Sequence, residues 1–365
     1  MDFDFELLRE LTETSGVPGY EDRIRDIVRR EFEGTVDSVH TDAMGNVVGT
    51  VEGASDYSVA VAAHMDEIGF MVRHITDEGF LELDALGGWD ADVLRAQRVR
   101  VHTEDGVSEP RSDGSEDERS ESSGDLTGVI GSIPTHAQDD DEEGLSVEDV
   151  HVDLGRPAEE VEERVSVGDL VSMDQTTVRV GENVTGKALD DRVCLFAMLE
   201  AAKRIENPDV TIHFCATVQE EVGVRGAPAL GVDLDPDLAV ALDVTVANDI
   251  PAVEKEGEYV TSLGDGAAIK LKDSSVVTTP KVHRRMRSVA EDRDIAHQLE
   301  VLPSGATDTS GFQNTHGAKP VGAISIPTRY LHTVTESVHH ADVEATIDLL
   351  TAFLETETGD HDYSL

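Results

Sequence analysis

The chain has 365 residues with a hydrophobic fraction of 39%, which suits about two domains with buried cores. Its 76 acidic residues outnumber 29 basic ones and give a formal net charge of −47. This charge argues against binding to nucleic acid and to anionic membrane surfaces.

The same acidity predicts a particular environment. Repulsion among so many carboxylates destabilises a compact chain in dilute buffer, but at molar salt the Debye length falls to about 3 Å and the repulsion largely disappears. The composition is therefore typical of a protein from a salt-loaded cytoplasm, such as that of halophilic archaea. An acidic disordered chain is the alternative, and the repeated apolar runs argue against it.

Neither secretion nor membrane insertion is expected. The two cysteines, Cys194 and Cys215, lie in apolar segments without CxxC spacing, so two buried thiols are expected rather than a disulfide or a metal pair. The start, MDFDFELLRE, is acidic and helical in pattern, unlike a secretory signal. No apolar stretch reaches about 18 residues, so no membrane span is expected. We therefore expect a cytoplasmic protein.

The first 67 residues have an α/β pattern. Apolar residues at helical spacing predict helices around Leu7–Leu11 and Ile24–Val28, separated by the breaker SGVPGYED. Strands are predicted at 45–51 and 58–63.

From about Phe70 to residue 180, short β-like segments alternate with turn signals and indicate a small barrel or sandwich. The segments are 70–75, 79–88, 97–103, 128–133 and 167–173. An acidic segment at 104–125, rich in Ser, Glu, Asp and Gly, is expected to be a flexible solvated insertion. A second acidic loop is expected at 139–143.

After Gly181 the α/β pattern returns. The expected helices are 191–205, 281–293 and 342–353, the expected strands are 210–218, 238–242, 297–302 and 320–326, and 224–230 is a helix or a loop. The prediction is one α/β catalytic domain, residues 1–67 and 181–365, with a β domain inserted at 68–180.

Polar side chains follow two of the predicted strands. His64 and Asp66 come directly after the strand at 58–63, and residues i and i+2 share one face of an extended chain. Glu220 and Glu221 follow the strand at 210–218. Two adjacent carboxylates at the tip of a buried strand repel each other and resist desolvation, so a positive charge must compensate them. A metal ion is the simplest candidate.

Three more potential ligands occupy comparable places. Asp243 ends the strand at 238–242, His332 lies a few residues past the strand at 320–326, and Asp190 precedes the helix at 191–205. Ligands of open α/β sheets bind outside the carboxyl ends of the strands. Two histidines and several carboxylates suit zinc, cobalt or manganese. Five or six such ligands fit two ions about 3.5–4 Å apart.

Each candidate also has an ordinary structural interpretation. Taken alone, His64 would be a hydrogen-bonded histidine, and Asp190 and Asp191 would be helix caps. Glu220 and Glu221 would be solvated charge at a strand end. Asp243 would be a turn residue and His332 a surface histidine. Their joint occurrence at comparable places on different elements favours one site.

Five segments in order, HMDEIGFMV, GKALDDR, VQEEVGVRGA, ALDVT and RYLHT, resemble the tetrahedral (TET) aminopeptidases, a family of cytosolic dinuclear metallopeptidases. GVIGSIPTH and SGATDTS also resemble family segments, and the likeness covers nearly the whole chain. The acidic segment at 104–125 departs from the usual family length. The resemblance implies an α/β/α sandwich with a mixed sheet, similar to metallo-aminopeptidases and phosphorylases, and an inserted small β-barrel.

The resemblance also implies two metal ions, zinc or cobalt, and a role for each ligand. Asp190 should bridge the two ions, His64 and Asp243 should complete the site of one, and Glu221 and His332 should complete the site of the other.

The catalytic residues are implied in the same way. Glu220 should be the general base and Asp66 should orient His64. The Asp190–Asp191 peptide bond is expected to be cis. The substrate pocket is expected to involve the loop Ser304–Ser310, with Gly305, Thr307 and Asp308, and the segment after Asp243.

The implied activity is removal of N-terminal amino acids from short peptides, by dimers that assemble into a hollow dodecamer. A related metal-dependent amidohydrolase that deacylates small amines is the alternative enzyme. A glycosidase using Glu220 and another carboxylate is a further alternative, but it leaves the histidines unexplained. A shell protein without catalysis conflicts with the intact ligand set, and a monomer with a solvated β domain is the alternative to assembly.

Overall fold

The computed structural model describes residues 3–103, 124–132, 146–253 and 260–365, and the chain forms two compact units. Unit 1 comprises residues 1–67, 177–331 and 335–365, and unit 2 comprises 68–176 and 332–334. Of the helices in the described ranges, none combines the length and the apolar character that crossing a membrane requires. The acidic loop expected at 139–143 and residues 104–123 of the expected insertion lie outside the described residues.

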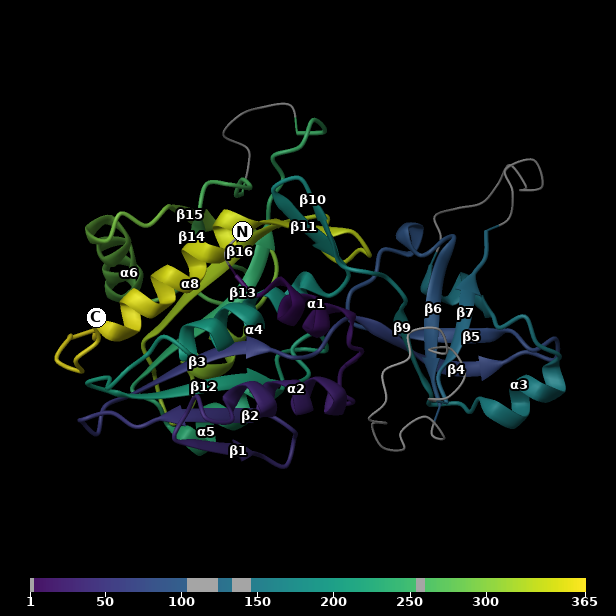
Figure 1. Cartoon of the computed structure of the whole chain (residues 1–365), viewed down its shortest axis with the longest axis horizontal. Helices are drawn as coiled ribbons and strands as arrows, with labels where there is room; N and C mark the ends of the chain where they lie inside the picture. The colour runs from purple at the N-terminus through teal and green to yellow at the C-terminus, as the bar shows by residue number, and fades with distance from the viewer. Residues whose placement is uncertain (1–2, 104–123, 133–145, 254–259) are drawn as a thin grey trace. The chain divides into compact units, whose positions relative to one another are not determined.

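Unit 1 is built on an 11-stranded mixed sheet in the order β1-β2-β12-β3-β13-β16-β17-β11-β10, with β14 paired to β16 and β15 to β14. Figure 1 shows β1, β2, β12 and β3 side by side in this order. The strands are β1 (Ser38–Thr41), β2 (Val47–Val51), β3 (Ser58–His64), β10 (Val178–Val180), β11 (Asn183–Gly186), β12 (Thr211–Thr217), β13 (Leu238–Val246), β14 (Ala267–Lys272), β15 (His297–Val301), β16 (Val321–Arg329) and β17 (Glu336–His339).

Helices pack on both faces of this sheet, because its central strands are apolar on both sides. The helices of unit 1 are α1 (Phe5–Glu13), α2 (Asp22–Phe32), α4 (Leu189–Ala202), α5 (Gly226–Leu234), α6 (Pro280–Asp292), α7 (Asp308–Gln313) and α8 (His340–Glu355). In β3, Val59, Val61 and Ala63 pack in one core with α4 and α8. Ala60 and Ala62 pack in another core with α5 and α7.

Unit 2 is a closed barrel in the order β4-β5-β8-β7-β6-β9. Its elements are β4 (Gly69–Ile75), β5 (Leu81–Leu86), the 3-10 helix η1 (Ala91–Val93), β6 (Gln97–His102), β7 (Leu126–Ile130), the 3-10 helix η4 (Val147–Asp149), β8 (His151–Asp153), α3 (Ala158–Arg164) and β9 (Leu170–Met173). Phe70 stacks on Trp89 with ring centroids 5.0 Å apart, and the barrel has its own apolar core.

Side-chain contacts join the two barrel strands that flank residues 104–123. His102 Nδ1 lies 3.1 Å from Asp125 Oδ1, and its Nε2 lies 2.9 Å from Ser172 Oγ. The hydroxyl of Thr103 donates a hydrogen bond to the carbonyl of Gly124 at 2.9 Å. The chain therefore leaves and re-enters the barrel at adjacent points.

The predicted α/β fold with a mixed sheet and a small barrel is confirmed. One boundary that matters for the site was wrong, because β13 does not end at Asp243 but continues to Val246. Its pairing with β3 stops at Ala241, whereas its pairing with β16 continues through Val246. The strand is therefore supported on one side only beyond Ala241.

Candidate metal centre

The register of the parallel strands brings His64 and Asp243 to the same level. Thr217 of β12 pairs with His64 of β3, and Ala62 of β3 pairs with Ala241 of β13. Continuing that register by two residues places Asp243 opposite His64. Because side chains alternate along a strand, both lie on the same face as Ala62 and Ala241, at the carboxyl end of β3.

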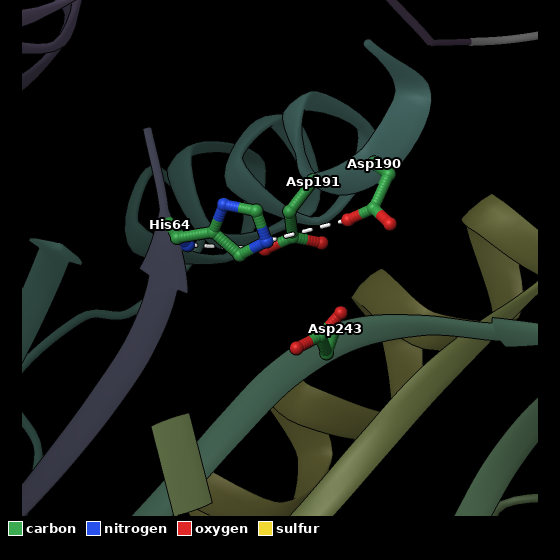
Figure 2. Close-up of side chains that lie close together, drawn as sticks. All are labelled: His64, Asp190, Asp191 and Asp243. Carbon is green, nitrogen blue, oxygen red and sulfur yellow. Dashed lines mark hydrogen bonds and ion pairs between the residues drawn. The ribbon is translucent and has the colours of Figure 1, made fainter. Parts of the chain in front are cut away.

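The first turn of α4 adds two carboxylates to this point. His64, Asp190, Asp191 and Asp243 are all buried, and each offers a potential metal-ligand atom within 4.8 Å of the others. Nε2 of His64 lies 3.3 Å from Asp190 Oδ1, and the backbone N–H of His64 donates to Asp191 Oδ2 at 3.1 Å (Figure 2). Helix α4 and strands β3 and β13 thus converge on one cluster.

An irregular start of α4 directs both aspartates into the cluster. Ala188 has a positive φ of 53°, and Asp190 and Asp191 have non-helical backbone angles. The peptide bond between Asp190 and Asp191 is cis, as the family resemblance implied. The backbone N–H of Asp190 donates to Glu336 Oε2 at 3.0 Å. This hydrogen bond holds the turn that precedes the regular part of α4.

Asp191 is the cluster member that the sequence reasoning missed. We considered it only as a helix cap beside Asp190, whereas its carboxylate is fully buried among the potential ligands. The doubled aspartate in GKALDDR was the available signal. It does not reveal which of two neighbouring carboxylates turns inward, because the irregular backbone at this turn decides that.

Glu220 and Glu221 lie beyond the regular part of β12, which ends at Thr217. Gln219 has a positive φ of 57° and Gly223 one of 112°, so the chain turns sharply on both sides of the pair. The strand ends one residue before the predicted boundary at 218, so the chain has left strand geometry before it reaches Glu220. One carboxylate oxygen of Glu220, Oε2, lies 3.9 Å from His64 Nε2, at the border of the cluster.

Asp66 connects the two segments that carry these residues. Its two carboxylate oxygens accept hydrogen bonds from the backbone N–H groups of Glu220 and Glu221, each at 3.0 Å. Its carbonyl oxygen lies 3.0 Å from His64 Nδ1, and its Oδ1 lies 3.5 Å from the same nitrogen. Asp66 therefore contacts the His64 ring with its backbone and its carboxylate, and also fixes the turn that carries both glutamates.

Burial makes this cluster unfavourable for carboxylates alone. It raises the pKa of Asp243 to about 8, helped by the charge of Asp190, and it raises the pKa of Asp191 and of Glu220 well above their usual range. Burial lowers the pKa of His64, but its hydrogen bonds to Asp190 and Asp66 outweigh this and raise it well above the usual value. Nearby cationic charge would stabilise the ionised carboxylates.

The donor set fits a divalent metal ion. One imidazole with several carboxylate oxygens and no thiolate suits zinc, cobalt or manganese. Because burial raises the pKa values of these carboxylates, a bound cation would allow them to ionise at neutral pH.

The residues predicted for the substrate loop have different surroundings. Asp308 begins α7, is buried, and accepts a hydrogen bond from the hydroxyl of Thr217, the strand neighbour of His64. Burial raises its pKa to about 6. Thr307 is also buried, and its hydroxyl donates to Thr309 Oγ1 at 2.9 Å. Gly305 is exposed and has a positive φ of 100°.

His332 is grouped with unit 2 rather than unit 1. Its Nδ1 lies 2.7 Å from the carbonyl oxygen of Gly88, within the same unit. Its expected role as a ligand together with Glu221 stays a prediction.

The α/β fold and a cluster that could hold a metal ion at the carboxyl ends of parallel strands fit the class of metal-dependent hydrolases. Residues 45–349 match the family model described as M42 glutamyl aminopeptidase. The lysyl aminopeptidase of Pyrococcus furiosus is 33% identical over 360 residues, covering 96% of this chain and 97% of the relative. The chain belongs to the M42 glutamyl aminopeptidase family, and it is an aminopeptidase.

Solved structures agree with this assignment. An aminopeptidase of the archaeon Desulfurococcus kamchatkensis superposes with a TM-score of 0.88 at 36% identity, covering 96% of this chain and 94% of the other. The TET1 peptidase of Pyrococcus horikoshii gives a TM-score of 0.83 at 32% identity, covering 96% of this chain and 99% of the other. The latter is described as able to assemble into a tetrahedron or a large octahedral shell. The resemblance to the TET aminopeptidases is thereby confirmed.

Proposed function

We propose that this aminopeptidase uses two divalent metal ions, zinc or cobalt, to remove N-terminal residues from short peptides. The supporting observation is the buried cluster of His64, Asp190, Asp191 and Asp243, whose potential ligand atoms all lie within 4.8 Å of one another, with Glu220 at its border. In this proposal His64 and Asp243 would hold one ion, Glu221 and His332 would hold the other, and Asp190 would contribute to both sites.

The proposed chemistry assigns the proton transfers to Glu220. When bound, the ions would lower the pKa of a coordinated water and polarise the scissile carbonyl. Glu220 accepts the proton of the attacking water and later donates it to the leaving amine. Burial raises the pKa of Glu220, which suits a group that must both take and release a proton. Asp66 keeps Glu220 in place through its backbone N–H.

The test of this function is hydrolysis of aminoacyl anilides in molar KCl, with and without a chelator. We expect activity on substrates with a free amino group, complete loss with chelator, and recovery with zinc or cobalt. The panel should include glutamyl and lysyl substrates, because the family model is described as a glutamyl aminopeptidase and the Pyrococcus furiosus relative as a lysyl aminopeptidase. Activity restricted to N-acylated substrates would instead support the amidohydrolase alternative, and activity that survives removal of all metal would refute the proposal.

We place the substrate near the loop that leads into α7. Support comes from Asp308, whose buried carboxylate is bonded to Thr217 beside His64. Thr307 and Gly305 belong to the same loop and are included for that reason. The preferred substrate side chain is left to the panel above.

The proposed assembly is a dodecamer built from dimers, with unit 2, the barrel, as the dimerisation unit. Support comes from the Pyrococcus horikoshii peptidase, which is described as forming a tetrahedron, and from a second TET1 structure described as a dodecamer. Light scattering in molar KCl should give about twelve times the 39.4 kDa chain mass. A species of one chain mass would refute the assembly. We also propose a cytoplasmic location, supported by the buried free thiols of Cys194 and Cys215.

A further inference from the structure

Two segments that are distant in sequence supply three of the four members of the cluster in unit 1, and Asp243 of β13 is the fourth. Residues 64–67 carry His64 and Asp66, and residues 186–191 carry Asp190 and Asp191. Before an ion binds, the carboxylates of the cluster repel one another. Contacts outside the cluster therefore help to maintain the spacing of the two segments.

A buried ion pair joins these two segments. Nζ of Lys187 lies 2.6 Å from Glu67 Oε2, and their side chains are only 5% and 3% exposed. Glu67 comes three residues after His64, and Lys187 comes three residues before Asp190. At the other end of each segment, the backbone N–H of His64 donates to Asp191 at 3.1 Å. The two segments are thus held together at both ends.

Glu67 is also bonded to the connection between α1 and α2. Its Oε1 accepts from the backbone N–H of Gly16 at 3.1 Å, and its own N–H donates to the carbonyl of Gly16 at 2.9 Å. Both carboxylate oxygens of Glu67 therefore have a partner, and its backbone cannot shift without breaking the bonds to Gly16.

Arg192 completes the network from the side of α4. It is fully buried, and its guanidinium donates to the carbonyl oxygens of Leu11 at 2.6 Å, Thr14 at 3.0 Å and Gly16 at 3.3 Å. A Cβ at Gly16 would lie 2.9 Å from Arg192 Nη2. The connection between α1 and α2 thus binds the segment of His64 through Glu67 and the start of α4 through Arg192.

We infer that Glu67 and Lys187 are positioning residues for the metal centre. Their ion pair sets the distance between His64 and Asp190 before an ion binds, so the ion finds its ligands already in place. Neither side chain needs to touch the ion or the peptide. The inference rests on the proposed roles of His64 and Asp190 as metal ligands. Groups that hold metal ligands in place commonly contribute about 10–100-fold to metal affinity or activity.

The test is a titration of the metal-free protein with Co²⁺ in molar KCl, followed by visible absorption, at a temperature where circular dichroism shows every variant folded. We expect Glu67→Gln and Lys187→Met each to weaken Co²⁺ binding at least about tenfold and to alter the cobalt spectrum. The matched control is Glu357→Gln. Glu357 is equally buried beside a cation, Arg285, but lies near the C-terminus and contacts neither of the two segments. The control should bind Co²⁺ as the wild type does.

A double variant separates positioning from stability. Replacing both partners of a buried ion pair by neutral groups often restores the stability that single replacements remove. Glu67→Gln combined with Lys187→Met should therefore be more stable than either single variant, while its Co²⁺ affinity stays at least about tenfold below wild type. Wild-type affinity in the double variant, or an equal loss in Glu357→Gln, would overturn the inference. This variant also answers the question if the single variants do not fold.

His64→Ala distinguishes this inference from the proposal on which it rests. If His64→Ala loses Co²⁺ and Glu67→Gln retains it, only the positioning inference is wrong. If His64→Ala binds Co²⁺ as tightly as the wild type, the ligand assignment itself is wrong.

Discussion

Glu220→Gln should lower kcat by about 10²–10⁴-fold, the usual contribution of a general base, and leave the metal content unchanged. Glutamine has nearly the same shape and keeps the backbone N–H that donates to Asp66, so the turn should persist. It cannot accept the proton of the attacking water. Turnover of an aminoacyl anilide and metal content by mass spectrometry, both in molar KCl, measure the two quantities separately.

The neighbouring glutamate provides the control for this prediction. Glu221→Gln should lose metal as well as activity, because Glu221 is the proposed metal ligand. The two variants are comparable, since the backbone N–H of Glu221 is also bonded to Asp66. A Glu220→Gln enzyme with normal metal content and wild-type kcat would remove Glu220 from the mechanism. Loss of metal from Glu220→Gln but not from Glu221→Gln would mean that the two roles are exchanged.

Removing the metal should destabilise the protein progressively as the pH rises from about 4 to about 8. Burial and the charge of Asp190 raise the pKa of Asp243 to about 8 in the folded, metal-free protein, whereas an unfolded aspartate titrates near about 3.9. A raised pKa means that the folded state holds a proton which the unfolded state releases. The resulting stability is present below the unfolded pKa and is lost as the pH rises through the folded value.

Asp191 and Glu220 have pKa values raised in the same direction, so they add to this effect. Each unit of pKa shift corresponds to about 1.36 kcal/mol. A bound ion favours the charged carboxylates and should abolish the loss. The difference in melting temperature between protein with excess metal and chelated protein should therefore grow from pH 5 to pH 8 at constant molar KCl.

Carboxylates outside the cluster should cancel in that difference. Burial raises the pKa of Glu21 to about 7 and that of Asp342 to about 6, and both are present with or without metal. Asp243→Asn should reduce the pH dependence of the chelated protein, because it removes one of the titrating groups. A difference in melting temperature that does not change with pH would contradict the prediction.

The part of the site that follows from strand pattern could be predicted from the sequence. His64 comes directly after an apolar run. Side chains alternate along a strand, and ligands of α/β sheets bind at the carboxyl ends of the strands, so these two rules are enough to predict that His64 lies at the site. The end of β13 could not be predicted, because its apolar run continues past Asp243 and the strand is limited by its partners. The relevant fact, that β13 keeps pairing with β16 through Val246 after its pairing with β3 ends at Ala241, depends on other segments of the chain.

The contacts that hold the site together were also beyond the sequence reasoning. Asp66 was expected only to orient His64, yet its carboxylate bonds the backbone N–H groups of two residues more than 150 positions away. The inward turn of Asp191 depends on backbone angles at the start of α4. Neither feature alters the pattern of hydrophobic and polar residues along the chain, so the periodicity of that pattern does not reveal it.

The adjacent ends of β6 and β7 have a consequence for how this chain can vary. Because Thr103 and Gly124 are hydrogen-bonded to each other, the two ends of the connection between them lie next to each other. Each doubling of such a loop costs only about 0.6 kcal/mol in closure entropy. The barrel should therefore accept changes in the length of the connection between these two ends with little loss of stability. The connection between Thr103 and Gly124 is therefore a suitable position in the sequence for attaching a label or a second protein.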